Sequence, residues 1–252
     1  MGKLSGQFAL VTGAGQGVGQ GIALALAAEG AAVAVAGRTL AKCEETAKQI
    51  AARGGRAVAL RCDVCDAGDV QRTVDATVRE LGGLSILVNN AQEVPLGRLL
   101  DVTDEAFLAG FASGPLATHR FMRAAHPHLA KRGGVIINLG TAASLRHDPI
   151  GYGCYGAVKE ATRTLTRAAA VEWGADGIRA INILPLAESP GFAGWKAARP
   201  EEYAEYCKGI PVGYVGDCEK DIGRVVAFLC SEEGRYVNGT SITVDGGRDF
   251  LR

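Results

Sequence analysis

Short apolar segments alternate with longer amphipathic segments along the whole of this 252-residue chain. Several of the apolar segments are nearly continuous, which is typical of parallel strands that are covered on both faces. The expected strands are 8–12, 32–36, 57–61, 86–88, 135–139, 179–184 and 241–244. This alternation predicts an α/β fold with a doubly wound, parallel, seven-stranded sheet and helices on both of its faces.

The composition suits a chain that buries one large core. Hydrophobic residues make up 48% of the chain and charged residues 21%. We therefore expect a single domain over residues 1–252, without internal repeats or low-complexity linkers. The main irregular region is 186–216, which is rich in proline, glycine and aromatic residues. We expect this region to form a lid over the substrate.

The charge balance argues against nucleic acid and anionic membranes as partners. Lys plus Arg and Asp plus Glu both total 27, so the net charge is zero and no strong field recruits a polyanion. No apolar run reaches the ~20 residues of a membrane span, and the N-terminus has no signal-peptide profile. We expect a cytoplasmic protein.

Metal binding is not indicated by the cysteines and histidines. The seven cysteines are an odd number without framework spacing, which fits reduced thiols. Cys62 and Cys65 form one C-x-x-C pair, and no second pair completes a zinc site. The segment His126-Pro127-His128 is more typical of a helix-end turn than of a ligand pair. No metal is expected.

A glycine-rich turn follows the first expected strand and precedes a helix expected over 20–29. Gly13, Gly17 and Gly19 give the spacing Gly-x-x-x-Gly-x-Gly. Glycines allow a tight turn and a close approach to a pyrophosphate, which then lies at the positive end of the helix. The turn therefore predicts a dinucleotide site. Its candidate cofactor-binding residues are Gly13, Gly15, Gln16, Gly17 and Val18.

Tyr155 and Lys159 stand four residues apart in a helical pattern, which places a phenol and an ammonium on one helix face. A free tyrosine has a pKa near ~10, and a nearby cation lowers that pKa. The pair predicts an acid that exchanges a proton with a substrate oxygen. Taken alone, the pair also fits a half-buried tyrosine beside a solvated lysine.

Together these segments resemble the short-chain dehydrogenase/reductase family in its single-domain form, and 3-oxoacyl-carrier-protein reductase-like members in particular. The matching motifs are Thr12-Gly13-x-x-x-Gly17-x-Gly19, Asp63-Val64, Asn89-Asn90-Ala91, Asn138, Tyr155-x-x-x-Lys159, Asn182 with Pro185, and Val244-Asp245-Gly246-Gly247. The resemblance implies a Rossmann-like fold and hydride transfer between a nicotinamide cofactor and a ketone or secondary alcohol. It also implies a homotetramer, with the Tyr155 helix and the last strand at two interfaces.

The resemblance assigns roles to individual residues. Asp63 is expected to accept a hydrogen bond from the adenine amino group, with help from the backbone of Val64. Lys159 is expected to bind the nicotinamide ribose and to lower the pKa of Tyr155, which handles the proton. The other residues implied to line the cofactor are Asn90, Ala91, Pro185 and Ser189.

Two departures from the family pattern affect the catalytic residues. The slot of the catalytic serine falls on Thr141, whose hydroxyl can also polarise a substrate oxygen, and Ser144 is a second candidate. The slot of the helix asparagine that holds a water in the proton relay falls on Gly114. Pro115 follows it, and a proline inside a helix can kink the axis and free a carbonyl. We hypothesise that such a carbonyl holds the water instead.

Two further departures and an aromatic segment concern the substrate pocket. Gln92 and Leu186 replace glycines beside the expected nicotinamide site, where they contact substrate or pack against a neighbouring loop. The aromatic residues of the expected lid form an ordinary apolar helix face or a wall over the substrate. Its substrate-contact candidates are Phe192 and Trp195.

The end of the second strand indicates the cofactor. Position 37 is a glycine rather than an acid that would pair with the ribose of NAD, and Arg38 offers a planar cation suited to phosphate. NADP(H) is therefore favoured over NAD(H). Lys42 is a second candidate for the phosphate partner.

Two other functions remain open at this point. Gly114, Gln92 and Leu186 would fit a regulatory or scaffolding protein that binds cofactor with little or no turnover. The same fold could also use Tyr155 for epimerisation or dehydration. The Tyr155–Lys159 pair favours the reductase or dehydrogenase.

Overall fold

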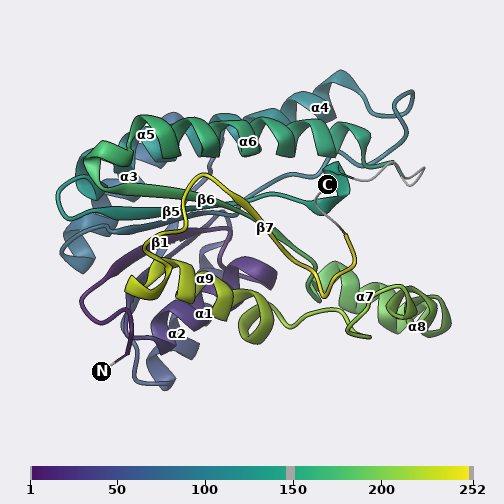
Figure 1. Cartoon of the computed structure of the whole chain (residues 1–252), viewed down its shortest axis with the longest axis horizontal. Coiled ribbons are helices and arrows are strands. Elements are labelled where there is room, and N and C mark those ends of the chain that lie inside the picture. The colour runs from purple at the N-terminus through teal and green to yellow at the C-terminus, as the bar shows by residue number, and fades with distance from the viewer. Residues whose placement is uncertain (1, 146–150, 250–252) are drawn as a thin grey trace.

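The computed structural model describes residues 2–145 and 151–249, which contain seven strands in one parallel sheet (Figure 1). The strand order is β3-β2-β1-β4-β5-β6-β7. The predicted doubly wound parallel sheet is confirmed. The strands are β1 (Phe8–Thr12), β2 (Ala32–Gly37), β3 (Ala57–Arg61), β4 (Ile86–Asn89), β5 (Gly134–Leu139), β6 (Ile178–Pro185) and β7 (Ser241–Val244).

Helices cover both faces of the sheet. Figure 1 shows α3, α4, α5 and α6 above the sheet and α1, α2 and α9 below it. The α-helices are α1 (Gly17–Ala28), α2 (Leu40–Ala52), α3 (Ala67–Leu81), α4 (Asp104–Phe111), α5 (Ala117–Leu129), α6 (Gly153–Glu172), α7 (Pro190–Ala198), α8 (Pro200–Lys208) and α9 (Arg224–Cys230). The short helical turns are η1 (Ala112–Leu116), η2 (Ala142–Ser144), η3 (Gly174–Asp176), η4 (Cys218–Gly223) and η5 (Glu232–Gly234).

The core has one cluster on each face because successive residues of a strand point to opposite sides. In β1, Val11 packs into the cluster on the α1 side, whereas Leu10 packs into the cluster that contains Phe121 of α5. The central strands are buried on both faces, and all six residues of β5 are buried. This double burial explains why the strands read as nearly continuous apolar runs.

Helix α1 begins three residues before its predicted start, at Gly17. The backbone N–H of Gln20 donates to the carbonyl of Gln16, so the first turn includes the glycines themselves. The glycine-rich turn therefore passes directly from β1 into the helix.

The region 186–216 was expected to be irregular, and that expectation is wrong for much of its length, because it contains α7 and α8. A proline stands in the first turn of each helix, where its missing N–H costs no hydrogen bond. Figure 1 shows the two helices beyond the end of the sheet. Within the described residues, we find no helix with the length and apolar character that spanning a membrane requires.

Candidate active site

Two adjoining cavities lie at the carboxyl ends of the strands, where α/β proteins with open sheets bind ligands. The first has a volume of about 290 Å³ and the second about 480 Å³. Gln16 and Gln92 line both cavities, so the two lie next to each other. The predicted cofactor residues in the first are Gly13, Gly15, Gln16, Arg38, Asp63, Val64 and Ala91. Those in the second are Gln16, Gly17, Val18, Asn90, Lys159, Pro185 and Ser189.

The glycine-rich turn leaves no room for a side chain at Gly13 or Gly15. Gly13 has φ +64°, and a Cβ there would lie 2.8 Å from Nδ2 of Asn90. That amide nitrogen donates to the carbonyls of Thr12 and Gly13 and so fixes the turn against β4. A Cβ on Gly15 would lie 2.8 Å from Cβ of Lys42. The glycines therefore let the backbone itself face the first cavity.

The N-terminus of α1 suits a pyrophosphate. Its N-cap residue, Gln16, makes no side-chain capping hydrogen bond, and no acidic residue lies in the first turn. The backbone N–H groups of that turn thus have no side-chain cap, and an anion there is stabilised by the helix dipole. Together with the glycine turn, this end of the helix fits the phosphates of a dinucleotide.

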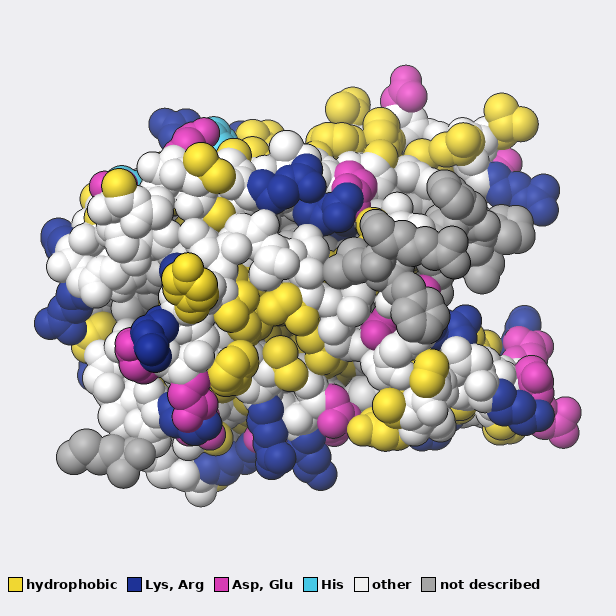
Figure 2. All heavy atoms as spheres, in the orientation of Figure 1, with side chains coloured by type: hydrophobic (Ala, Val, Ile, Leu, Met, Phe, Trp, Pro, Cys, Tyr) yellow, Lys and Arg dark blue, Asp and Glu magenta, His cyan; other side chains and the backbone are white. Residues whose placement is uncertain are grey.

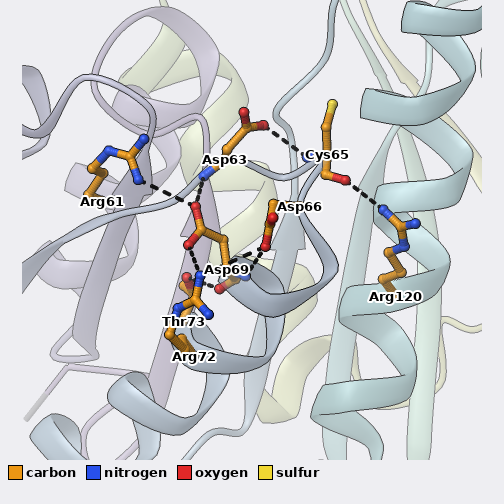
Figure 3. Close-up of polar contacts among 8 residues, drawn as sticks. All are labelled: Arg61, Asp63, Cys65, Asp66, Asp69, Arg72, Thr73 and Arg120. Carbon is orange, nitrogen blue, oxygen red and sulfur yellow. Dashed lines mark hydrogen bonds and ion pairs between the residues drawn. The ribbon is translucent and has the colours of Figure 1, made fainter.

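The loop after β3 holds Asp63 in place through a network of polar contacts (Figure 3). Oδ1 of Asp63 accepts from the N–H of Cys65 at 3.0 Å, and the N–H of Asp63 donates to Asp69 at 3.0 Å. That N–H and the guanidinium of Arg72 lower the pKa of Asp69. Arg120 of α5 donates to the carbonyl of Cys65 at 2.7 Å. Asp63 is thereby held at the wall of the first cavity.

Arg38 and Glu93 form an ion pair in the first cavity, with 2.6 Å between Nη1 and Oε1. Lys42 also lines this cavity, and its Nζ donates to Oε1 of Gln16 at 2.5 Å. Arg38 and Lys42, the two candidate partners of a cofactor phosphate, thus each already contact a neighbouring side chain. Glu93 was not singled out from the sequence, because nothing in a local pattern pairs it with a residue 55 positions away.

Tyr155, Lys159 and Thr141 all line the second cavity. Tyr155 and Lys159 come from successive turns of α6, and Thr141 follows the end of β5. Lys159 is buried, and its Nζ donates to the carbonyl of Leu139 at 2.6 Å. The three predicted catalytic residues therefore line the same cavity, and their catalytic role stays a prediction.

The predicted lowering of the Tyr155 pKa is not found. Burial raises the pKa of Tyr155 to about 12, although a hydrogen bond with Thr141 acts in the opposite direction. Burial also lowers the pKa of Lys159 to about 8. Nζ of Lys159 lies 5.7 Å from the centroid of the Tyr155 ring. Desolvation therefore outweighs the hydrogen bond with Thr141 in setting the pKa of Tyr155.

Ser144, the second candidate for the serine slot, does not line the cavity. Its Oγ lies 2.7 Å from Oε1 of Glu160 and 2.8 Å from the carbonyl of Thr141, as a donor to either. Oγ1 of Thr141 accepts from the N–H of Ala143, and Thr141 itself lines the cavity. The geometry thus favours Thr141 as the hydroxyl beside Tyr155.

Gln92 and Gly114, two of the departures from the family pattern, lie against each other. A Cβ on Gly114 would lie less than 2.5 Å from Oε1 of Gln92. Nε2 of Gln92 donates to the carbonyl of Gly110 at 2.9 Å. Gly114 and Pro115 lie in η1, a π-helical turn that interrupts the regular α-helix between α4 and α5. The carbonyl of Gly110 thus accepts a hydrogen bond from a protein side chain, and the hypothesis that a carbonyl freed by Pro115 holds the relay water stays a prediction.

The substrate candidates divide into two groups. Gln92, Leu186 and Phe192 line the second cavity, whereas Trp195 does not. Trp195 instead packs edge-on against Tyr203 and Tyr206, with ring centroids 5.6 and 5.4 Å away. The aromatic residues thus mainly join α7 to α8, which is the ordinary packing interpretation.

Tyr152 is a cavity residue that sequence reasoning missed. Its ring centroid lies 6.4 Å from that of Tyr155. The three-residue spacing before Tyr155 was a signal for this contact, since residues three apart share a helix face.

A family model described as enoyl-(acyl carrier protein) reductase matches residues 13–249. The chain belongs to the short-chain dehydrogenase/reductase family. Like its family, it is an oxidoreductase that acts on hydroxyl or carbonyl groups and binds NAD(P)(H).

Its relatives within the short-chain dehydrogenase/reductase family include a 12alpha-hydroxysteroid dehydrogenase from Clostridium sp., which is 35% identical over 98% of both chains. A dehydrogenase/reductase from Sinorhizobium meliloti superposes with a TM-score of 0.89 at 34% identity, covering 98% of this chain and 96% of the other. A 7 alpha-hydroxysteroid dehydrogenase, solved with NADH and 7-oxo glycochenodeoxycholic acid, superposes with a TM-score of 0.90 at 29% identity. That match covers 97% of this chain and 94% of the other.

Proposed function

We propose that the protein is an NADP(H)-dependent dehydrogenase or reductase of a ketone and secondary-alcohol pair, with Tyr155 as its acid and base. The observation that carries the proposal is the meeting of Tyr155, Lys159 and Thr141 in a cavity that adjoins the glycine-rich turn. A protein that only binds a dinucleotide has little use for a phenol and a hydroxyl in this position.

Each of the three catalytic residues has its own role in the proposed reaction. The cofactor supplies hydride exchange with the substrate carbon. Thr141 donates a hydrogen bond to the substrate oxygen and polarises it, and Tyr155 gives or takes the proton at that oxygen. Lys159, fixed by the carbonyl of Leu139, supplies positive charge beside the phenol and binds the nicotinamide ribose.

The adenosine end of the cofactor belongs in the first cavity. Asp63 is our candidate acceptor for the adenine amino group, and Arg38 is our candidate partner for the 2′-phosphate of NADP(H). A guanidinium binds phosphate with two parallel hydrogen bonds, so Arg38 favours NADP(H) over NAD(H). In Arg38→Ala we expect NADPH to bind more weakly and NADH to bind almost unchanged.

The second cavity suits an apolar carbonyl compound. Leu186, Phe192, Val94 and Tyr152 surround the catalytic residues there. The volume of about 480 Å³ lies within the range of drug-sized ligand pockets, and the substrate would share it with the nicotinamide half of the cofactor. We propose a ring-bearing or medium-length ketone as the substrate, and hydroxysteroid dehydrogenases among the relatives make steroid ketones an appropriate first test.

We also propose a homotetramer in the cytoplasm. Exposed apolar side chains such as Val171 and Leu108 support self-association. All seven cysteines are free thiols, which is typical of proteins in a reducing compartment.

The test is the loss of NADPH absorbance with cyclic, aromatic, acyl-thioester and steroid ketones, measured for the wild type and Tyr155→Phe. We expect turnover to fall about 10²–10⁴-fold in the variant, because the proton donor is lost, while NADPH binding is retained. Undiminished turnover in Tyr155→Phe would exclude the phenol as the acid. Tight NADPH binding without turnover on any ketone would favour the regulatory or scaffolding function, and product without net cofactor change would favour epimerisation or dehydration.

A further inference from the structure

We infer that Glu93 is a specificity-determining residue, whose carboxylate limits the preference for the 2′-phosphorylated cofactor by competing for Arg38. The inference rests on the proposed nicotinamide-cofactor function. It concerns the first cavity, which would receive the adenosine half of the cofactor. It does not concern Tyr155, Lys159 and Thr141.

Glu93 and Arg38 reach each other across the first cavity. Arg38 follows the end of β2 and Glu93 lies in the segment after β4, and these strands flank β1 on opposite sides. Nη1 of Arg38 lies 2.6 Å from Oε1 of Glu93, and both residues line the cavity. The ion pair therefore joins two rims of the site.

The backbone of Glu93 is firmly held. Its N–H donates to Oγ of Ser113 at 2.9 Å, and its carbonyl accepts from Nε2 of Gln92 at 2.7 Å. Ser113 lies in η1 and in turn donates to the carbonyl of Ala109 at 2.7 Å. This anchoring keeps the carboxylate within reach of Arg38.

The charges that line the first cavity cancel. Arg38 and Lys42 contribute two positive charges, and Asp63 and Glu93 contribute two negative charges. A cavity built only to attract a phosphate would carry an excess of positive charge. Without Glu93 the same lining would be positive by one charge.

The two cofactors respond differently to this pair. The side chains of Arg38 and Glu93 are 64% and 42% exposed, so their ion pair is weak and a phosphate can displace the carboxylate. The displaced carboxylate stays near a phosphate of charge about −2 and repels it. The hydroxyl of NAD(H) requires no such displacement. Glu93 therefore reduces the advantage that Arg38 gives to NADP(H).

The experiment measures the binding of NADPH and NADH to the full chain by isothermal titration calorimetry at low and physiological salt. In Glu93→Gln we expect the ratio of NADPH to NADH affinity to rise about tenfold, from removing one like charge a few ångströms from the phosphate. The increase should be larger at low salt. Glu93→Asp keeps the charge and should keep a ratio near that of the wild type.

Glu45→Gln is the matched control, because it removes the same charge from an exposed position of α2 outside the cavity. Its affinity ratio should equal that of the wild type. An unchanged ratio in Glu93→Gln, or an equal change for both nucleotides, overturns the role of Glu93 and leaves the proposed function standing. If the wild type binds neither nucleotide, both the role of Glu93 and the proposed function fail.

Discussion

Lys159 shows how much the surroundings of one residue decide its chemistry. Its side chain is buried at the end of β5, where the carbonyl of Leu139 accepts a hydrogen bond from Nζ. Loss of water around the ammonium lowers its pKa from 10.5 to about 8. A charged Lys159 therefore lowers the free energy of unfolding, because the ammonium loses water in the native protein and is fully hydrated in the unfolded chain.

This burial predicts a pH-dependent contribution to stability. Between pH 8 and about 10.5, native Lys159 has lost its proton while the unfolded chain still binds it. Since the unfolded state then binds more protons, the free energy of unfolding rises with pH across this window, by up to about 3 kcal/mol for this residue. The quantity to measure is the difference in urea unfolding free energy between wild type and Lys159→Met at pH 7 and pH 10.

The matched comparison for this prediction is Lys131→Met, which removes an exposed lysine. For Lys131→Met the difference from wild type should not change with pH. A Lys159→Met difference that is equally independent of pH would show that the ammonium is hydrated in the native protein.

At the scale of elements, η1 illustrates how two unusual residues accommodate each other. Pro115, which lacks an N–H, lies within a π-helical turn, and Gly114 leaves space beside it. The Gln92 side chain fills this space and donates to the carbonyl of Gly110. Gly114 and Gln92 therefore complement each other in packing, although each by itself is a departure from the family pattern.

The pairing predicts coupled effects on stability. In Gly114→Asn the new side chain would meet Gln92 and Val158, which lies 2.9 Å from the added Cβ. We expect this variant to lose about 1–3 kcal/mol of unfolding free energy through overpacking. Adding Gln92→Gly makes room, so the double variant should recover about 1 kcal/mol relative to the sum of the single changes. A urea double-mutant cycle measures this coupling, and additive effects would contradict it.

At the scale of the whole molecule, the parallel sheet brings the site together. Residues from the ends of β1, β2, β3, β4, β5 and β6 meet at one edge because parallel strands end on the same side.

The outer surface of the molecule exposes apolar side chains in several places. Figure 2 shows hydrophobic side chains gathered on the face where Figure 1 places β7. Val171 of α6 is 84% exposed and Leu108 of the neighbouring α4 is 65% exposed.

Such exposed apolar side chains predict an interface between copies of the chain. Val171→Glu combined with Leu108→Glu should convert the expected homotetramer into a smaller species, because burying two carboxylates opposes association. Sedimentation velocity measures the change. Lys48→Glu on α2, on the opposite face of the sheet, should leave the assembly intact. A tetramer that persists in the double variant would place the interface elsewhere.

The sequence by itself determined the fold and most of the site. Apolar strands covered on both faces have a recognisable pattern, and Gly13, Tyr155 and Lys159 belong to motifs of fixed local spacing. These features depend on neighbours within a few residues, so a linear pattern is enough to predict them. The helices α7 and α8 were an exception, because their prolines and glycines resembled those of a loop.

Only the tertiary structure decided how distant residues act on one another. It paired Arg38 with Glu93, placed Gln92 against Gly114, and removed enough water from around Tyr155 to raise its pKa to about 12. Such effects arise from Coulomb attraction, packing and desolvation over a few ångströms in space. Residues 55 positions apart in the chain become neighbours in this protein only once the sheet has formed.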